Sequence, residues 1–420
     1  MSLEDQVARF IENLAGGSGL PLRIQLWNGR LIALAPDPPI TITLPRAEAA
    51  RYLLAPSLAR LGEAYVEGHL QVTGSVWEIL RLAETLSRQA EGMSRRKPWR
   101  PFVHSRKRDA EAIQYHYDVS NDFYRLWLDR NMVYSCGYFE GGTEDIHQAQ
   151  EQKLDHICRK LLLQPGERFL DIGCGWGSLL RWAAKHYGVE ATGITLSRNQ
   201  FDYASALIKE EGLEDRCRVL LCDYRDLAGE GDYDKIASVG MFEHVGEKNL
   251  PLYFGVAHRL LRDGGLMLNH GIATSEANPS AHDVGAGEFI ERYVFPYGET
   301  PALSTVIRDM GAQGLEILDV EGLRPHYAQT LMHWVSRLEA NREAAIDLVG
   351  GKRYRIWQIY MAGCAHAFEH GWVSVYQLLV SKQKAGIPAL PWSRAHLYTP
   401  RDRVAHARLH RPEIALSPSP

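Results

Sequence analysis

The chain has 420 residues, of which 45% are hydrophobic and 23% are charged, and its formal net charge at pH 7 is −4. This composition is typical of an ordinary globular protein of two or three domains, and it argues against a disordered or fibrous chain. It also argues against a protein that coats nucleic acid, because that function requires a basic surface over much of the fold. No uncharged apolar run approaches the roughly 18 residues that cross a bilayer, so we expect any membrane contact to be peripheral.

The cysteines and the first residues of the chain bear on its location. The sequence contains six cysteines without a CxxC pair, so neither a zinc site nor a disulfide framework is indicated. Its opening residues lack the basic end and the apolar block of a secretory signal. We therefore expect a cytoplasmic protein with reduced thiols and no bound metal.

The first hundred residues predict a small mixed module of helices and strands. A helical opening is followed by alternating residues 22–26, by Asn28-Gly29 and by apolar residues 31–34, which predicts a hairpin with a type I′ turn. A strand at residues 40–44 and a helical stretch ending near Gly68 follow. No cluster of chemically reactive side chains occurs here, so we interpret residues 1–92 as an accessory domain, either structural or lipid-contacting.

Residues 93–110 differ in composition from the rest of the chain, because cations and aromatic side chains crowd together there. These residues are Arg95, Arg96, Lys97, Trp99, Arg100, Phe102, Arg106, Lys107 and Arg108. A solvated linker is the plain interpretation of this segment. It can also dock on an anionic lipid surface, where each cation contributes about 1 kcal/mol.

From about residue 150 onward, strands and helices alternate, which predicts a parallel α/β sheet. The strands are expected at residues 168–172, 189–195, 218–221, 235–239, 266–272 and 373–380. Helices are expected at residues 178–187, from the second strand to near Gly212, at 250–262 with Gly264-Gly265 as its stop, and around 328–370. We expect one domain over residues 111–400 and a tail over residues 401–420.

The most informative segment is Asp171-Ile-Gly173-Cys-Gly175-Trp-Gly177, which lies between an expected strand and an expected helix. Glycines at such a turn let the backbone approach a ligand closely, although a simple tight turn is the alternative. The GxGxG spacing differs from the GxGxxG of dinucleotide binders, and the second strand ends on hydroxyl and amide side chains instead of a carboxylate. Asp223-Tyr224-Arg225 ends the third strand at the same edge of the sheet, where we expect it to hold an adenine ring.

Around these positions the sequence resembles the cyclopropane fatty acid synthases and the related mycolic acid methyltransferases. The resemblance runs over about residues 111–382, and the N-terminal module also looks like the accessory domain of this family. It is carried by Tyr115-His-Tyr-Asp-Val-Ser-Asn-Asp-Phe-Tyr124, Tyr134-Ser-Cys-Gly-Tyr138, Asp171–Gly177, Gly240-Met-Phe-Glu-His-Val-Gly246 and Tyr327-Ala-Gln-Thr-Leu-Met332. The resemblance implies an α/β class I S-adenosylmethionine-dependent methyltransferase, with a Rossmann-like seven-stranded sheet and a small N-terminal α+β domain.

The resemblance also implies which residues contact S-adenosylmethionine. From the methionine end to the adenine they are Tyr134, Ser135, Asp171, Gly173, Gly175, Gly177, Thr195, Gln200, Tyr224 and Arg225. For Tyr134 alone, a buried core tyrosine would be the ordinary interpretation.

Methyl transfer to an isolated cis double bond must develop positive charge on carbon, because the alkene is a poor nucleophile. Aromatic faces stabilise such a cation by roughly 0.5–2 kcal/mol each when water is excluded. The candidate aromatic residues are Tyr117, Tyr138, Tyr293, Phe295 and Tyr327, although core packing is the ordinary function of any one of them.

The family resemblance implies that a bound bicarbonate ion is the base that removes a proton. The matching positions in this chain are Cys136, Glu243, His270, Ile272 and Tyr327. An amide, an imidazole and a phenol can donate hydrogen bonds to the ion, and a carboxylate can accept one from it. Taken singly, a cysteine such as Cys136 is more often an inert buried hydrophobic residue, and His270 is more often a histidine of the core. A cysteine nucleophile at Cys136 has little support, because no hydrolase motif surrounds it. We expect His244 to be structural.

We therefore expect a cyclopropane-fatty-acyl-phospholipid synthase, which acts on unsaturated phospholipid as a homodimer at the inner face of the membrane. A related methyltransferase with a methyl-branched, methylene or furan-precursor product is the alternative. Residues 285–298 depart from the bacterial synthase pattern, since Gly-Glu-Phe replaces its usual Asp-Pro-Trp, which leaves chain specificity and product open. A non-catalytic lipid-binding protein on the same fold is disfavoured by the glycine turn and by Glu243.

Overall fold

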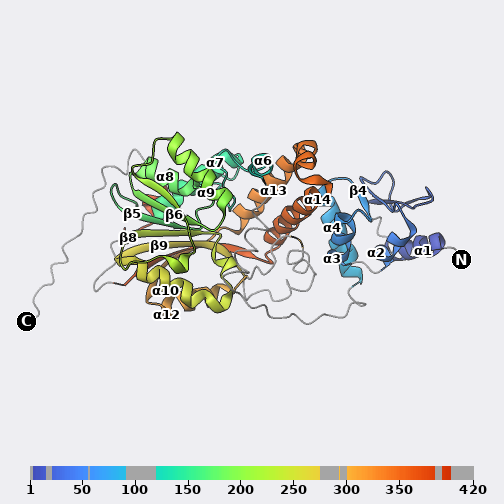
Figure 1. The fold of residues 1–420 in the computed structure, drawn as a ribbon. Coiled ribbons are helices and arrows are strands. Elements are labelled where there is room, and N and C mark those ends of the chain that lie inside the picture. Colours follow the sequence, from blue (N-terminus) through green and yellow to red (C-terminus); the bar gives the residue numbers. More distant parts are fainter. Residues whose placement is uncertain are drawn as a thin grey trace, which may run out of the picture.

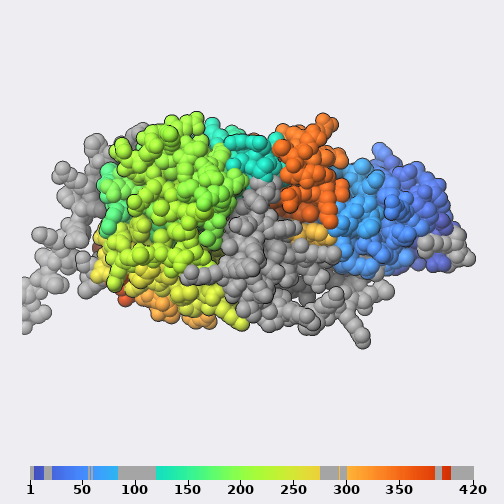
Figure 2. Space-filling model, in the orientation of Figure 1, coloured from blue at the N-terminus to red at the C-terminus, as the bar shows by residue number. Residues whose placement is uncertain are grey.

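We describe the protein from a computed structural model over residues 3–15, 21–54, 57–90, 120–274, 293, 300–383 and 390–398. The N-terminal residues form a four-stranded sheet and the later residues a seven-stranded sheet. These two parts lie at opposite ends of the molecule, with the long helices α13 (Arg324–Ala340) and α14 (Arg342–Glu369) between them (Figure 1, Figure 2). The expected basic linker, Tyr117, Phe295, nearly all of residues 285–298 and the tail from residue 401 lie outside the described residues.

The N-terminal sheet has the strand order β2-β1-β3-β4. Its strands are β1 (Leu22–Gln25), β2 (Leu31–Ala33), β3 (Ile40–Thr43) and β4 (Gln71–Thr73), and its helices are α1 (Leu3–Ala15), α2 (Ala50–Leu54), α3 (Leu58–Val66) and α4 (Val76–Ala90). Leu22 and Ile24 alternate with partly exposed residues in β1, which gives the sheet one buried face. This part is the small α+β unit that the sequence predicts.

The hairpin between β1 and β2 forms where expected, but its predicted turn type is wrong. Gly29 has a φ of 84°, whereas Asn28 is not among the residues with positive φ. The amide of Leu26 donates to the carbonyl of Arg30 at 2.9 Å, and the amide of Gly29 donates to the carbonyl of Leu26 at 2.9 Å. The loop therefore has three residues and needs positive φ only at its glycine, unlike a two-residue type I′ turn.

The large sheet has the strand order β10-β11-β9-β8-β5-β6-β7. Its strands are β5 (Arg168–Ile172), β6 (Glu190–Thr195), β7 (Cys217–Leu221), β8 (Tyr233–Val239), β9 (Leu261–Ala273), β10 (Leu315–Gly322) and β11 (Ser374–Lys382). Strands β5 to β9 run parallel to one another, and β11 is antiparallel to both β9 and β10. The pattern of the sequence did not single out β10, because this edge strand is largely part-exposed.

Helices cover both faces of this sheet. Helices α7 (Ile146–Lys160), α8 (Ser178–Tyr187) and α9 (Arg198–Glu210) lie on one face, and α10 (Leu250–Leu260) and α12 (Leu303–Ala312) on the other (Figure 1). Successive residues of β5 serve opposite cores, since Phe169 packs in the cluster under α7 and α8 and Leu170 packs in the cluster under α10 and α12. The central strands β5 and β6 are accordingly buried at every residue but the first, as expected for a parallel sheet covered on both faces.

One expected boundary is wrong, between α10 and β9. The helix ends at Leu260, and β9 begins at Leu261, so that Gly264-Gly265 lies inside the strand instead of stopping the helix. Leu261 pairs with Tyr233, and the register with β8 shifts before Lys235 pairs with Leu266. The helix thus ends before the glycines, because the residues that precede them already pair with the neighbouring strand.

Helix α14 connects the two parts of the molecule. The Tyr65 hydroxyl donates to Gln358 Oε1 at 2.7 Å, Arg355 Nη2 donates to the Val66 carbonyl at 2.9 Å, and Lys352 pairs with Glu67 at 2.8 Å. No helix within the described ranges has both the length and the apolar character required to cross a membrane. The contacts attach the N-terminal part to a helix whose other end, at Phe368, reaches the candidate active site.

Candidate active site

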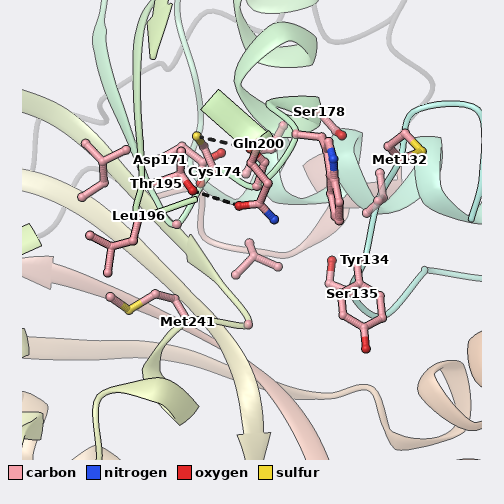
Figure 3. Close-up of a pocket in the computed structure, with 18 of the residues that line it drawn as sticks. Met132, Tyr134, Ser135, Asp171, Cys174, Ser178, Thr195, Leu196, Gln200 and Met241 are labelled. Atoms are coloured by element: carbon pink, nitrogen blue, oxygen red, sulfur yellow. Dashed lines mark hydrogen bonds between the residues drawn. The ribbon is translucent and has the colours of Figure 1, made fainter. Parts of the chain in front are cut away.

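A cavity lies at the carboxyl ends of β5, β6, β7 and β8, which is the edge at which open α/β sheets bind ligands (Figure 3). Its walls come from the turn between β5 and α8, from the ends of the neighbouring strands and from the segment before α7. Most of the residues expected at the cofactor line it, namely Tyr134, Ser135, Asp171, Gly173, Gly175, Thr195, Gln200 and Tyr224. The structure thus brings together residues that are as many as 90 positions apart in the sequence.

The glycine turn is needed for close packing at this point. Gly173 has a φ of 82°, and a Cβ atom there would lie 3.0 Å from Cγ of Met241, which follows β8. Asp171, in β5, is only 2% exposed, and burial raises the pKa of its carboxyl to about 7. Backbone and one carboxylate therefore form the floor of the cavity.

Two residues expected at the cofactor do not line the cavity. Gly177 begins α8 with a φ of 79°, and a Cβ atom there would lie 3.0 Å from Cβ of Ala204, so this glycine lets α8 approach α9. Arg225 donates to Asp223 at 2.8 and 2.6 Å, and its guanidinium lies 5.4 Å from the ring centre of Tyr224. Both residues are therefore adjacent in the chain to residues that line the cavity, but they do not line it themselves.

The end of β6 contributes uncharged polar groups. The Thr195 hydroxyl donates to Gln200 Oε1 at 2.9 Å, and the Ser197 hydroxyl accepts a hydrogen bond from the Gln200 amide at 3.3 Å, which caps α9. Trp176 also lines the cavity, and its indole N–H donates to Asn121 Oδ1 at 2.8 Å. Hydroxyl and amide groups at this end suit the hydroxyls of a ribose.

Lys153, in α7, lines the other end of the cavity, and sequence reasoning missed it. It is 2% exposed, and its Nζ donates to the Ser135 hydroxyl at 2.9 Å. Burial lowers the pKa of Lys153 to about 8, and the nearby carboxylate of Asp129 opposes this shift. The available signal was its spacing, because Lys153 lies on the same helix face as the buried residues Ala149 and Ile157.

Glu243 follows β8 in a short 3-10 helix, η4 (Phe242–His244), and its carboxylate reaches the next strand. Oε1 accepts a hydrogen bond from the amide of Ile272, in β9, at 2.7 Å. Oε2 is buried, without a hydrogen-bond partner among the described residues. Burial raises the pKa of Glu243 to about 7. His244, expected to be structural, lines the cavity.

His270 lies two positions before Ile272 in β9, so both side chains point to the same face of the sheet. Its Nδ1 lies 3.1 Å from Nε2 of Gln377, in β11. An amide nitrogen can only donate, so Nδ1 accepts and Nε2 carries the proton. This Nε2 is buried and has no partner in the part of the chain that the structure describes. Burial lowers the pKa of His270 to about 3, which keeps the ring neutral.

Cys136 and Tyr327 complete the expected reaction site. Cys136 is fully buried, and burial raises the pKa of its thiol well above the usual range, which argues against a thiolate nucleophile. Tyr327, near the start of α13, has its ring centre 4.6 Å from that of Phe368. Cys136, Ile272 and Tyr327 belong to one apolar cluster, and Ile272 joins this cluster to Glu243.

Two other candidate aromatic residues make contacts of their own. The Tyr138 ring stacks between His156, at 4.2 Å, and His326, at 4.9 Å. The Tyr293 hydroxyl donates to Glu67, in the N-terminal part, at 3.1 Å. Tyr134 and Trp176 line the cavity, and both pack in a large aromatic cluster with Tyr124, Trp127, Trp334 and Trp357.

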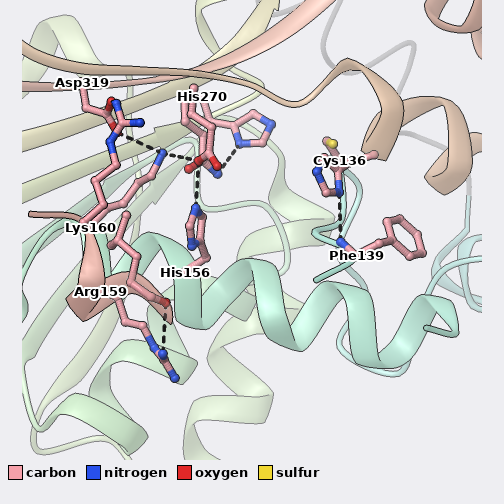
Figure 4. A network of polar contacts seen from close by, with 12 residues as sticks. Cys136, Phe139, His156, Arg159, Lys160, His270 and Asp319 are labelled. Carbon is pink, nitrogen blue, oxygen red and sulfur yellow. Dashed lines mark hydrogen bonds and ion pairs between the residues drawn. The ribbon is translucent and has the colours of Figure 1, made fainter. Parts of the chain in front are cut away.

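A buried ion-pair network lies between α7 and β10, on the same side of the sheet as His270 (Figure 4). Lys160 pairs with Glu321 at 2.5 Å, and His156 pairs with the same carboxylate at 2.8 Å. These contacts tie α7 to the edge strand β10. They hold the helix that carries Lys153 against the sheet that carries His270.

The order of the strands, with β11 antiparallel between β9 and β10, and a cavity over the glycine turn define a class I S-adenosylmethionine-dependent C-methyltransferase. The chain belongs to the mycolic acid cyclopropane synthetase family, whose model matches residues 104–378. A second model, described as a domain of unknown function, matches residues 10–95.

Individual relatives agree with this assignment. The chain is 47% identical over 380 residues to a probable fatty acid methyltransferase of Pseudomonas putida, covering 90% of this chain and 96% of that protein. It is 38% identical over 280 residues to cyclopropane mycolic acid synthase 1 of Mycobacterium tuberculosis, covering 64% of this chain and 96% of that protein. The structure of the mycolic acid cyclopropane synthase CmaA1 complexed with SAH and CTAB matches with a TM-score of 0.62 and 36% identity, covering 65% of this chain and 98% of that one.

Proposed function

We propose that this methyltransferase acts on the cis double bond of an unsaturated acyl chain in a membrane phospholipid and closes a cyclopropane ring. The observation that carries the proposal is the position of Glu243. It lies between Met241 and His244, which line the cavity, and it contacts Ile272 at the edge of the aromatic cluster. A carboxylate oxygen that is buried and has no partner in the described ranges is thereby available to a carbocation at this site.

The chemistry assigns a task to each part of this site. The carbon–sulfur bond of S-adenosylmethionine breaks, a carbon–carbon bond to the alkene forms, and S-adenosylhomocysteine leaves. Positive charge then appears on the second alkene carbon, and an ionised Glu243 stabilises it electrostatically. The aromatic rings around Tyr134 exclude water and also stabilise the cation. Loss of a proton from the added methyl closes the ring.

Two buried atoms without a hydrogen-bond partner among the described residues have the chemistry that a small oxyanion with a hydroxyl group requires. Nε2 of His270 presents an N–H, and Oε2 of Glu243 presents an acceptor. A bicarbonate ion bound there would supply a base for the proton. One expected donor does not fit, since the amide of Ile272 already donates to Glu243. We therefore propose Glu243 and His270 as the principal residues that would hold the ion.

A methyl-branched, methylene or furan-precursor product is a second candidate, because the same cation forms first and only the position of proton loss differs. The similarity to a protein named as a probable fatty acid methyltransferase favours this candidate. Expression in a bacterial host without its own synthase, followed by lipid mass spectrometry and hydrogenolysis, separates the products. A mass gain of one methylene with a ring that opens on hydrogenolysis supports the cyclopropane, and an unchanged lipid profile contradicts both candidates.

The acceptor is tested directly by release of S-adenosylhomocysteine in the presence of liposomes. We expect release with unsaturated phosphatidylglycerol and none with the saturated lipid of the same headgroup. Equal release from both would contradict an alkene acceptor.

We also propose that the enzyme binds the inner membrane surface peripherally and works as a dimer. Sedimentation at working concentration tests the dimer.

A further inference from the structure

We propose that Lys153 and Ser135 form the subsite that binds the α-carboxylate of S-adenosylmethionine, with the Lys153 ammonium as the charge partner of that carboxylate. The proposal rests on the use of S-adenosylmethionine and does not depend on the acyl acceptor. It assigns a function to a residue with no chemical motif around it in the sequence.

The burial of Lys153 is the first observation. The residue is 2% exposed in the middle of α7 and lines the cavity at the same end as Ser135. An ammonium has three N–H donors, and the hydrogen bond found for this one within the described residues goes to the neutral Ser135 hydroxyl at 2.9 Å. Buried lysines are rare unless a charge partner compensates for lost hydration. A partner is therefore expected on the cavity side.

Asp129 is the acid with the largest electrostatic effect on Lys153, and both of its carboxylate oxygens already accept hydrogen bonds from backbone amides. Asp129 is 2% exposed, its Oδ1 accepts from the Val133 amide at 2.7 Å, and its Oδ2 accepts from the Asn131 amide at 2.9 Å. These bonds shape the segment that brings Ser135 to the cavity. Asp129 thus influences Lys153 through space but keeps its own hydrogen-bonding atoms for the loop.

The charges of the cavity lining match the charges of the cofactor. Asp171 and Lys153 are buried ionisable residues of the lining, whereas Thr195, Gln200 and Tyr224 contribute uncharged polar groups. The cofactor also has both kinds of group, because its methionyl end carries an ammonium and a carboxylate while adenine and ribose carry no charge. Pairing Lys153 with the carboxylate and Asp171 with the ammonium places the methionyl end beside Cys136 and the reaction site.

Electrostatics supports this assignment. Burial lowers the pKa of Lys153 to about 8, so its charge is only moderately favoured in the free enzyme. A carboxylate ligand at hydrogen-bond distance would stabilise the charged form. By contrast, the charge of Lys160 is already stabilised by its ion pair with Glu321, so a ligand in the cavity would not stabilise it further.

The test compares two ligands by calorimetry on the full-length enzyme. They are S-adenosylhomocysteine and its decarboxylated analogue, S-adenosyl-3-thiopropylamine, which keeps the adenosine and the ammonium. In Lys153→Met we expect the affinity for S-adenosylhomocysteine to fall about 10- to 100-fold, as for loss of a charged hydrogen bond. The affinity for the analogue should change by less than about threefold, which also shows that the variant is folded. No acyl substrate is present, so failure of the proposed acceptor would leave this result unaffected.

Lys153→Gln is the second variant, because it keeps a donor for Ser135 and removes the charge. Lys185→Met is the control, since Lys185 is an exposed lysine of α8 outside the cavity, and it should leave the ratio of the two affinities at its wild-type value. Equal losses for both ligands, or no loss for S-adenosylhomocysteine, would overturn the proposal. Failure of both Lys153 variants to fold would assign this lysine a structural role and would overturn it as well.

Discussion

The carboxylate of Glu243 accepts a hydrogen bond from the backbone amide of Ile272 at 2.7 Å, which joins the turn after β8 to the end of β9. Its second oxygen is buried without a partner among the described residues. An unsatisfied buried acceptor costs about 1–3 kcal/mol in the resting protein. In the proposed reaction, a bound ion or the developing positive charge compensates for this cost.

Glu243→Gln is expected to reduce turnover at least about 100-fold, because the amide cannot stabilise positive charge or accept a proton. Cofactor affinity should stay within about twofold, since Glu243 itself does not line the cavity. Release of S-adenosylhomocysteine and calorimetric titration measure the two quantities. Glu247→Gln, at an exposed position nearby, is the control. A parallel loss of binding and turnover in Glu243→Gln would contradict a chemical role.

The same substitution should stabilise the protein in alkaline solution. Burial raises the pKa of Glu243 from 4.5 to about 7, so the folded state binds its proton more tightly than the unfolded state. This contribution to stability is present below pH 4.5 and is lost as the pH rises through about 7. Glutamine does not ionise, so the gain in unfolding free energy should be on the order of 1–3 kcal/mol larger at pH 8 than at pH 5. A gain that is independent of pH in urea unfolding would contradict this origin.

Cofactor affinity should have a maximum between about pH 7 and pH 8. Burial raises the pKa of Asp171 to about 7 and lowers the pKa of Lys153 to about 8 in the free enzyme. The cofactor ammonium favours ionised Asp171, and its carboxylate favours protonated Lys153, so binding weakens on both sides of the maximum. Asp129, Cys136, Cys158 and His270 are further titratable groups that interact electrostatically with Lys153.

Calorimetry with S-adenosylhomocysteine from pH 5.5 to 9 measures this profile. Asp171→Asn should remove the acid limb, and Lys153→Met should remove the alkaline limb. A flat profile in the wild-type enzyme would show that neither group titrates at the site.

Activity should fall in carefully decarbonated buffer and recover when bicarbonate is added. The physical reason is that Glu243 Oε2 can accept and His270 Nε2 can donate a hydrogen bond, and that neither atom has a partner within the described part of the chain. His270→Ala should weaken the response to added bicarbonate. An initial rate that does not respond to bicarbonate would remove the ion from the proposed reaction.

Reversal of Arg95, Arg96, Lys97 and Lys107 to glutamate should weaken binding to anionic liposomes. The effect should be greatest at low salt, because each cation contributes about 1 kcal/mol near the headgroups and salt screens it. Vesicle co-sedimentation at two salt concentrations measures it, with zwitterionic vesicles as the control. Unchanged binding would leave residues 93–110 as a plain tether.

Much of the fold follows from local features of the sequence. Apolar runs in β5 and β8 report burial on both sides, glycines mark the turn before α8, and Ser197 caps α9. The family motifs also identify residues such as Glu243 and Ser135 before any contact is known. These signals are local, because a strand, a turn or a cap depends mainly on residues within a few positions of itself.

The partners of these residues were decided only by the tertiary structure. A lysine in a helix is ordinarily exposed, yet the packing of α7 buries Lys153 against Ser135. The Ile272 amide reaches Glu243 only because β8 and β9 are neighbours, and Tyr138 packs between two histidines because α7 and α13 meet there. The net charge of −4 likewise describes the whole chain, and it does not reveal that a buried lysine and a buried aspartate line the same cavity. Charge, burial and hydrogen bonding at a site are properties of distances across the fold, and sequence spacing does not encode those distances.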